Sequence, residues 1–234
     1  GESWANTIKE ALQKHELINR PIHVISANLH SVMNTLHAPK ALKDLCDKHD
    51  IFTVYELLSK EENKLHRNKT KKVALQEGMV FIEDKSGTNI DVQIFDSAKI
   101  DFSNTEFEFE PTTEAPVIIV MDYAFGEQAY ETIDELLKPF KTPENNIHLN
   151  VDSISIMGKA GILEGSKGDI MIPSAHIFEG TADNYPFRNE LTLEDFETKG
   201  VKVFEGTMVT VLGTSLQNKD LLKFFHDSTW TVIG

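Results

Sequence analysis

Five consecutive apolar residues, Val117-Ile118-Ile119-Val120-Met121, constrain the fold of this chain more than any other segment. A near-continuous apolar run of this length is typical of a strand that is covered on both faces, as in parallel sheets. The following residues, 126–140, carry apolar side chains at helical spacing, and Pro139 and Pro143 end the pattern. A buried strand followed by a helix is a β-α unit, so the sequence predicts an α/β fold.

The residues before this unit predict an N-terminal helix, then a strand and two more helices. Helical spacing runs from residue 3 to residue 17, where Ser3 or Asn6 is the expected N-cap. An apolar run at 22–27 predicts a strand, and helical periodicity returns at 28–47 and 52–64. The polar stretch 63–72, which holds five Lys and Arg residues, is interpreted as a solvated connection.

Strand signals dominate the rest of the chain. Alternating residues at 73–109, with turn signals that include a hairpin at 84–88, predict two to four antiparallel strands. Further strands are expected at 153–157, 169–173, 201–212 and 230–233, with a helix at 218–226. We therefore expect one α/β domain over residues 1–234, with a mixed, mostly parallel central sheet, flanking helices and an N-terminal helix in residues 1–20. The final strand has no helix after it to cover it, so we interpret the chain as truncated after residue 234.

The composition excludes several classes of function. Asp and Glu number 37 against 23 Lys and Arg, and the resulting net charge of −14 repels a nucleic-acid backbone. Cys46 is the single cysteine, which rules out an internal disulfide and favours a reducing compartment. No apolar stretch approaches the roughly 20 residues that span a bilayer, and the first 20 residues are not a signal peptide. We expect a cytoplasmic protein without a nucleic-acid or membrane partner.

A glycine-punctuated loop follows the predicted strand at 153–157. Residues 157–173 read M-G-K-A-G-I-L-E-G-S-K-G-D-I-M-I-P, and we interpret the loop as a hinge between two central parallel strands. Gly158 and Gly161 are expected to take positive φ and to bring backbone amides close to a ligand. A bound anion or a sugar would account for such a loop.

Three motifs in this half of the chain resemble those of a known superfamily. They are Gly-Lys-Ala-Gly-Ile-Leu at 158–163, Lys-Gly-Asp-Ile-Met-Ile-Pro at 167–173 and Glu-Gly-Thr-Met-Val-Thr-Val-Leu-Gly at 205–213. Their order resembles the nucleoside phosphorylase/nucleosidase superfamily, including AMP nucleosidase, best over residues 115–234. The resemblance implies cleavage of the N-glycosidic bond of a purine nucleoside or nucleotide, by hydrolysis or by glycosyl transfer to phosphate. It also implies a homo-oligomer and no cofactor, with phosphate as an optional co-substrate.

The resemblance also implies where the ligand binds. In the glycine loop it nominates Gly158, Lys159, Ala160 and Gly161, and Lys159 stands where relatives present a small hydroxyl residue to phosphate. Lys159 would then supply a point charge to phosphate, or else be a surface lysine. The base pocket of relatives corresponds to Thr214, Ser215 and Leu216, and Leu216 replaces an aromatic residue of several relatives.

The residues that carry out catalysis in this superfamily are absent. The Glu-Met-Glu ribose motif and the catalytic acid of relatives follow the strand that here ends in Val-Ile-Gly at 232–234, so the catalytic residues are unknown. Two interpretations stay open. The chain is a piece of an enzyme, or it is a non-catalytic nucleotide-binding or sensory module on the same fold.

The ends of two predicted strands hold further candidates, because ligands of α/β sheets gather outside the carboxyl ends of strands. Asn28, His30 and Ser31 follow the first strand, and Asp122 and Tyr123 follow the apolar run. The alternative is local: Asn28 and Ser31 would cap the next helix, and Asp122 would be a turn residue. Histidines at 23, 30 and 37 recur every seven residues, but no Cys or Glu stands at ligand spacing, so no metal site is predicted.

Overall fold

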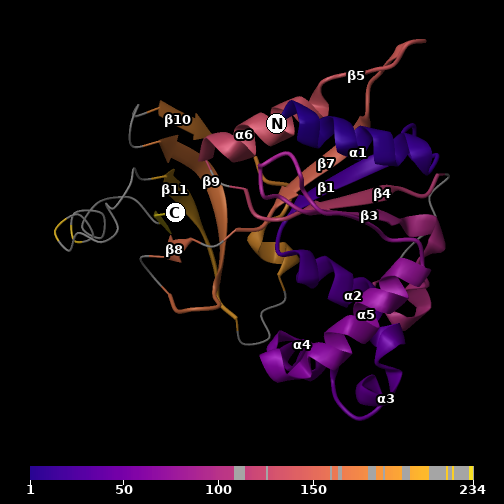
Figure 1. Ribbon diagram of the computed structural model, residues 1–234. Helices are drawn as coiled ribbons and strands as arrows, with labels where there is room; N and C mark the ends of the chain where they lie inside the picture. The colour runs from indigo at the N-terminus through magenta and orange to yellow at the C-terminus, as the bar shows by residue number, and fades with distance from the viewer. Residues whose placement is uncertain are drawn as a thin grey trace. The chain divides into compact units, whose positions relative to one another are not determined.

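A computed structural model describes residues 1–107, 114–124, 126–158, 160–162, 165–178, 183–186, 188–196, 201–210, 220, 223 and 232–233. The chain forms two compact units, Gly1–Gly158 and Lys159–Gly234 (Figure 1). Each unit contains a five-stranded sheet with both parallel and antiparallel pairings. The predicted α/β class, with a mixed sheet, flanking helices and an N-terminal helix, is confirmed.

The sheet of the first unit has the strand order β2-β3-β4-β1-β7. Strand β1 (Pro21–Ser26) pairs in parallel with both β4 (Val117–Met121) and β7 (Asn150–Ile156). Strand β3 (Val92–Asp96) pairs antiparallel with β4 and with β2 (Val80–Ile82). The apolar run therefore lies inside the sheet, as predicted. A separate ribbon joins β5 (Phe140–Lys141) to β6 (Asn146–Ile147).

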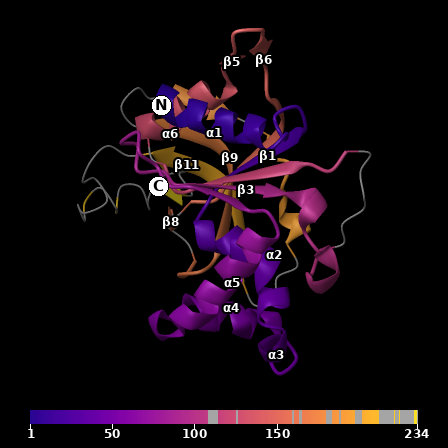
Figure 2. The ribbon, with the colours of Figure 1, turned by 45° about the vertical axis from the view of Figure 1, so that its right-hand side comes forward.

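Helices cover both faces of this sheet (Figures 1 and 2). On one face, Val117, Ile119 and Met121 pack with α1 (Glu2–Lys14) and with Leu136 of α6 (Gly126–Leu137). On the other face, Ile118 and Val120 pack beneath α2 (Leu29–Ala41) and α5 (Lys64–Gln76). Helices α3 (Lys43–Cys46) and α4 (Ile51–Ser59) and the 3-10 turn η1 (Glu61–Asn63) complete the segment between α2 and α5.

Three local predictions for this unit are wrong. Helix α1 starts at Glu2 without a side-chain cap, so Ser3 and Asn6 are ordinary helical residues. The supposed connection at 63–72 is mostly helix α5, whose buried positions Thr70 and Ala74 are small and give a weak apolar signal between the lysines. Helix α5 also takes up the first residues of the stretch 73–109, where strands were expected.

The rest of that stretch contains one antiparallel hairpin and two 3-10 turns. Strands β2 and β3 confirm the hairpin across 84–88. Turns η2 (Ser97–Lys99) and η3 (Phe102–Asn104) follow, because the carboxylates of Asp96 and Asp101 accept hydrogen bonds from the backbone N–H groups of Ala98 and Ser103. Residues 108 and 109 lie outside the described residues.

The sheet of the second unit has the strand order β10-β9-β11-β12-β8. Strand β11 (Val203–Thr210) runs parallel to β9 (Ile170–Phe178) and β12 (Val232–Ile233), while β8 (Gly161–Ile162) and β10 (Asp183–Pro186) are antiparallel to their neighbours. A 3-10 turn, η4 (Leu193–Asp195), precedes β11. The predicted helix at 218–226 lies almost entirely outside the described residues.

The glycine loop does not join two strands of one sheet, which corrects the predicted hinge. Strand β7 belongs to the first sheet and β9 to the second. A succession of strand, loop and strand is compatible with one sheet or with two, because only long-range pairing distinguishes them. Among the described residues the longest helices have 13 residues, and no helix there has the length and hydropathy to span a membrane.

Candidate functional site

The carboxyl ends of the parallel strands β4, β1 and β7 meet at one edge of the first sheet. Backbone hydrogen bonds continue past the strands at this edge, from Ala27 N to Met121 O (3.0 Å) and from Met157 N to Ser26 O (2.9 Å). The residues that follow the three strands are therefore held next to one another.

This edge contains a topological switch point. The chain leaves β1 into α2, which packs on one face of the sheet, and leaves the adjacent strand β4 toward α6, which packs on the other face. Open α/β sheets bind ligands outside the carboxyl ends of strands at such a point, because the two connections diverge there. The residues after β1 and β4 thus stand at the position where this fold class places its ligands.

Asn28 follows β1 and is the N-cap of α2. Its side-chain oxygen accepts a hydrogen bond from His30 N (2.8 Å), and its backbone oxygen accepts one from Ser31 N (3.0 Å). The capping alternative is confirmed for Asn28, whereas Ser31 is a helical residue and not a cap. His30 and Ser31 are exposed, and Asn28 is partly buried. The cap uses only the oxygen of Asn28, so its amide nitrogen is still a donor at this edge.

Asp122 and Tyr123 follow β4 and are both partly buried. Asp122 N donates to Asp91 O (3.0 Å), and Asp122 Oδ1 accepts a hydrogen bond from Tyr123 N (2.8 Å). Residues 122–124 form neither a hydrogen-bonded turn nor a bend, so the turn role of the local alternative is not observed for Asp122. Asp122 directly follows Met121, which pairs with Ser26 of β1, so its backbone lies at the switch point.

The loop between β2 and β3 lies at the same edge, because it precedes the residue of β3 that pairs with Met121. Asp84 organises this loop by accepting hydrogen bonds from Ser86 N (2.9 Å) and Asn89 N (2.7 Å). Partial burial opposes the ionisation of Asp84, but hydrogen bonds from Ser86 and Asn89 outweigh it and lower its pKa to about 2. The sequence showed only a hairpin here; the Asp, Ser and Asn spacing was the signal for an ordered polar loop.

Two further contacts anchor this loop. Gln128 of α6 donates a hydrogen bond to Thr88 O, and Asp91 Oδ1 accepts one from Asp84 N (2.9 Å). The loop therefore adds the carboxylates of Asp84 and Asp91 to that of Asp122 at one end of the sheet. Both oxygens of Asp84 already accept hydrogen bonds within the loop, so the loop acts on a ligand through its negative charge, which disfavours anions at this end. No group of three metal-binding side chains occurs among the residues that the structure describes.

The glycine loop differs from its prediction. Gly158 is exposed and lacks a positive φ, and Gly161 begins strand β8, where it pairs with Ile233. The expected positive φ at these two glycines is wrong, because Gly161 is part of an extended ladder. Positive φ occurs instead at Gly165 and Gly168.

Four other predicted site residues cannot be placed. Lys159, Thr214, Ser215 and Leu216 lie outside the described residues, while Ala160 is described and exposed. The candidates that the structure brings together are therefore those of the first unit: Asn28, His30, Ser31, Asp122 and Tyr123.

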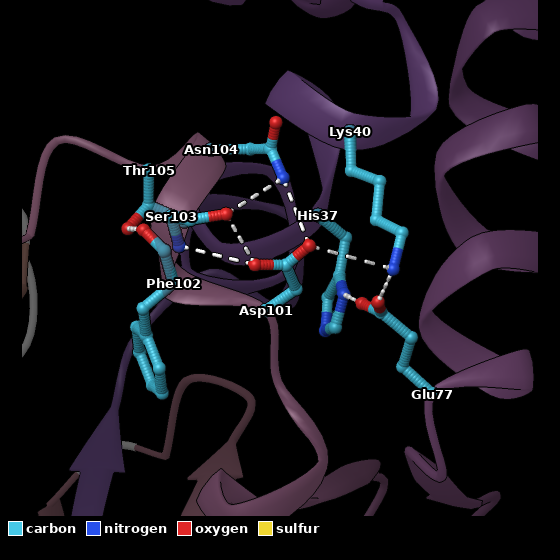
Figure 3. A network of polar contacts seen from close by, with 8 residues as sticks. All are labelled: His37, Lys40, Glu77, Asp101, Phe102, Ser103, Asn104 and Thr105. Carbon is cyan, nitrogen blue, oxygen red and sulfur yellow. Dashed lines mark hydrogen bonds and ion pairs between the residues drawn. The ribbon is translucent and has the colours of Figure 1, made fainter. Parts of the chain in front are cut away.

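A second polar site was missed from the sequence. It is the His37 cluster, made of His37, Lys40, Glu77 and Asp101 (Figure 3). The three regularly spaced histidines do not converge: His23 Nδ1 lies 2.7 Å from Ser153 Oγ, and His37 Nδ1 lies 2.7 Å from Glu77 Oε2. Glu77 is 40 residues from His37, so sequence spacing gave no sign of the pair.

Comparison with protein families gives a match that covers most of the chain. The model of a family of unknown function, DUF6909, matches residues 40–234. The chain belongs to this family. A search of curated proteins found no match. Among solved structures, this DUF6909 member is similar to a futalosine hydrolase mutant of Helicobacter pylori strain 26695, with 11% identity, 92% of this chain and 77% of that chain covered, and a TM-score of 0.43.

Proposed function

We propose that the protein binds a purine nucleoside or nucleotide at the switch point of the first sheet and cleaves its N-glycosidic bond. The observation that carries the proposal is the position of Asp122 and Asn28 after two adjacent parallel strands whose following helices lie on opposite faces. The three motifs of the second half, which resemble the nucleoside phosphorylase/nucleosidase superfamily, supply the reaction class.

Asp122 has the chemistry that the sugar requires. Its carboxylate accepts hydrogen bonds from ribose hydroxyls, and a negative charge nearby stabilises the oxocarbenium-like sugar that develops as the bond breaks. Asn28 supplies an amide donor to a ring or hydroxyl oxygen. The carboxylates of Asp84 and Asp91 at the same end repel phosphate, which favours water as the nucleophile over phosphorolysis.

The remaining roles follow from the resemblance. For the second unit taken by itself, the resemblance nominates Lys159 as a contact for an anionic substituent and Thr214, Ser215 and Leu216 as base-contacting residues. A homo-oligomer would complete the pocket, as in relatives. The acid that protonates the departing purine is unassigned, because the segment that carries it in relatives is absent from residues 1–234.

The activity is tested by incubating the protein with adenosine, inosine or AMP, with and without phosphate, and measuring free base by chromatography. Base release without phosphate is expected. Asp122→Asn should weaken nucleoside binding about 10- to 100-fold, because it removes the charge from a hydrogen-bonded acceptor. The matched control is Asp152→Asn, which makes the same change at an exposed position of β7 and should leave binding unchanged.

A second function, a non-catalytic nucleotide-binding or sensory module, is favoured by Leu216, which stands where several members of the superfamily place an aromatic residue. It predicts that nucleosides raise the melting temperature without any release of base. Absence of both binding and base release, in this chain and in any longer natural form, would refute both functions and leave an assembly domain as the explanation.

A further inference from the structure

His37 lies in the interior of the first unit, and only one of its two ring nitrogens has a hydrogen-bond partner among the described residues. The residue is 1% exposed, and its ring stacks on Phe95 with the centroids 5.7 Å apart and the planes at 23°. Nδ1 lies 2.7 Å from Glu77 Oε2, so Nδ1 carries the proton in the neutral ring. Among the described residues, Nε2 has no hydrogen-bond partner. A second proton would have to enter at this buried, unpartnered atom.

The cluster around His37 joins three segments that are distant in sequence (Figure 3). His37 and Lys40 belong to α2, Glu77 follows the end of α5, and Asp101 precedes the turn η3. Lys40 Nζ contacts the carboxylate of Glu77 and lies 4.0 Å from Asp101 Oδ2. Asp101 in turn accepts hydrogen bonds from Ser103 N (3.2 Å) and Asn104 Nδ2 (3.0 Å).

With His37 neutral, Lys40, Glu77 and Asp101 carry one positive and two negative charges, so protonation of His37 is opposed by the burial of its unpartnered Nε2 and not by the charge count. Lys40 already offsets the charge of Glu77, and the more exposed Asp101 faces Lys40 from the other side. The neighbour from β3 is Phe95, which offers no hydrogen-bond acceptor in the plane of the imidazole ring. Protonation would place an N–H donor and a second positive charge where burial makes both costly.

We propose that His37 is an acid-sensitive latch, whose protonation at Nε2 releases the end of α5 and the turn η3 from α2. Since α2 begins at the Asn28 cap, the same event loosens the helix that borders the switch point. The latch depends only on the contacts of the His37 cluster, so it does not require the proposed nucleoside function.

The direction of the pH effect follows from the burial of His37. Burial lowers the pKa of His37 below 6.5, and this outweighs the hydrogen bond and the charge of Glu77, which raise it. The folded state therefore binds fewer protons than the unfolded state. Its stability is complete above pH 6.5 and is lost as the pH falls through the folded pKa, by about tenfold in the folding equilibrium constant per unit of pKa difference.

The test combines an NMR titration of the histidine rings with amide hydrogen exchange at pH 7.5 and 5.5, corrected for intrinsic rates. His37 should titrate below 6.5, and amides of α2, the end of α5 and residues 97–105 should lose protection at pH 5.5. His37→Phe keeps an aromatic ring on Phe95 and leaves the Lys40–Glu77 pair, so this loss should disappear. His49→Asn, at an exposed histidine outside the His37 cluster, is the control and should behave like the unmodified protein.

A second variant separates the latch from simple packing. Glu77→Gln keeps an acceptor for Nδ1 but removes the charge that favours protonation, so the opening should move to lower pH. A His37 pKa at or above 6.5 would overturn the proposal. So would acid-induced opening that persists in His37→Phe, or an opening that moves to higher pH in Glu77→Gln. If His37→Phe does not fold, the titration and the Glu77→Gln variant still decide the matter.

Discussion

Lys9 offers the sharpest test of how the first unit is held together. It lies on α1, is 2% exposed, and places Nζ 2.7 Å from both Glu135 O and Lys138 O at the C-terminal end of α6. A buried ammonium thus satisfies two carbonyls that have no partner within their own helix. It also meets the negative end of the helix dipole.

Lys9→Met removes the ammonium while keeping the length and apolar stem of the side chain. Two hydrogen bonds to a charged donor contribute about 1.5–3 kcal/mol each, so their loss costs roughly 3–6 kcal/mol. Burial of the ammonium also costs free energy, as the lowered pKa of Lys9 indicates, so removing the charge offsets part of the loss in stability. We expect a net loss of about 2–3 kcal/mol in the free energy of unfolding, or a fall of about 4–12 °C in melting temperature.

The assay is thermal and urea unfolding of Lys9→Met beside Lys14→Met, an exposed lysine of the same helix. Lys14→Met should change the stability by no more than about 0.5 kcal/mol. A Lys9→Met protein as stable as the unmodified one, or more stable, would refute the reasoning. It would mean that desolvation of the ammonium costs as much as its two hydrogen bonds contribute.

Two further predictions concern backbone geometry. Asp84→Ala removes the acceptor for Ser86 N and Asn89 N and should destabilise the β2–β3 loop at pH 7. The loss should be only about 1 kcal/mol, because solvent screens the partly exposed carboxylate. Since the pKa of Asp84 is lowered to about 2, the difference between the two proteins should be complete above pH 4 and vanish as the pH falls toward 2 in urea titrations. Gly165→Ala should destabilise the second unit by about 1–3 kcal/mol, because φ is +105° and the new Cβ would lie 2.8 Å from the ring of Phe204. Gly158→Ala, with no atom within 4 Å of its Cβ position, should be nearly neutral in the same thermal melts, and equal losses in the two variants would contradict this account.

Local patterns predicted most elements of the first unit because their signals are local. The apolar run at 117–121 became β4, and the helical spacing at 126–140 became α6 (Gly126–Leu137). Helix α5 was missed because its buried positions are small residues among lysines, and lysine gives the same signal in an exposed helix as in a loop. The residues after β1 and β4 lie at one edge of the sheet, as expected for the carboxyl ends of parallel strands, and their role in ligand binding stays a prediction.

The sequence by itself determined the fold class, the order of most elements and the two strand ends that nominate Asn28 and Asp122. Only the tertiary structure decided that β7 and β9 belong to different sheets and that Glu77 forms a hydrogen bond with His37. The same holds for the hydrogen bond from Lys9 to the end of a helix more than a hundred residues away in sequence. Periodicity reports how a segment divides between interior and solvent, which depends on neighbours within a few residues. Sheet membership, buried ion pairs and unpartnered atoms depend instead on which distant segments pack together, and no local pattern encodes that choice.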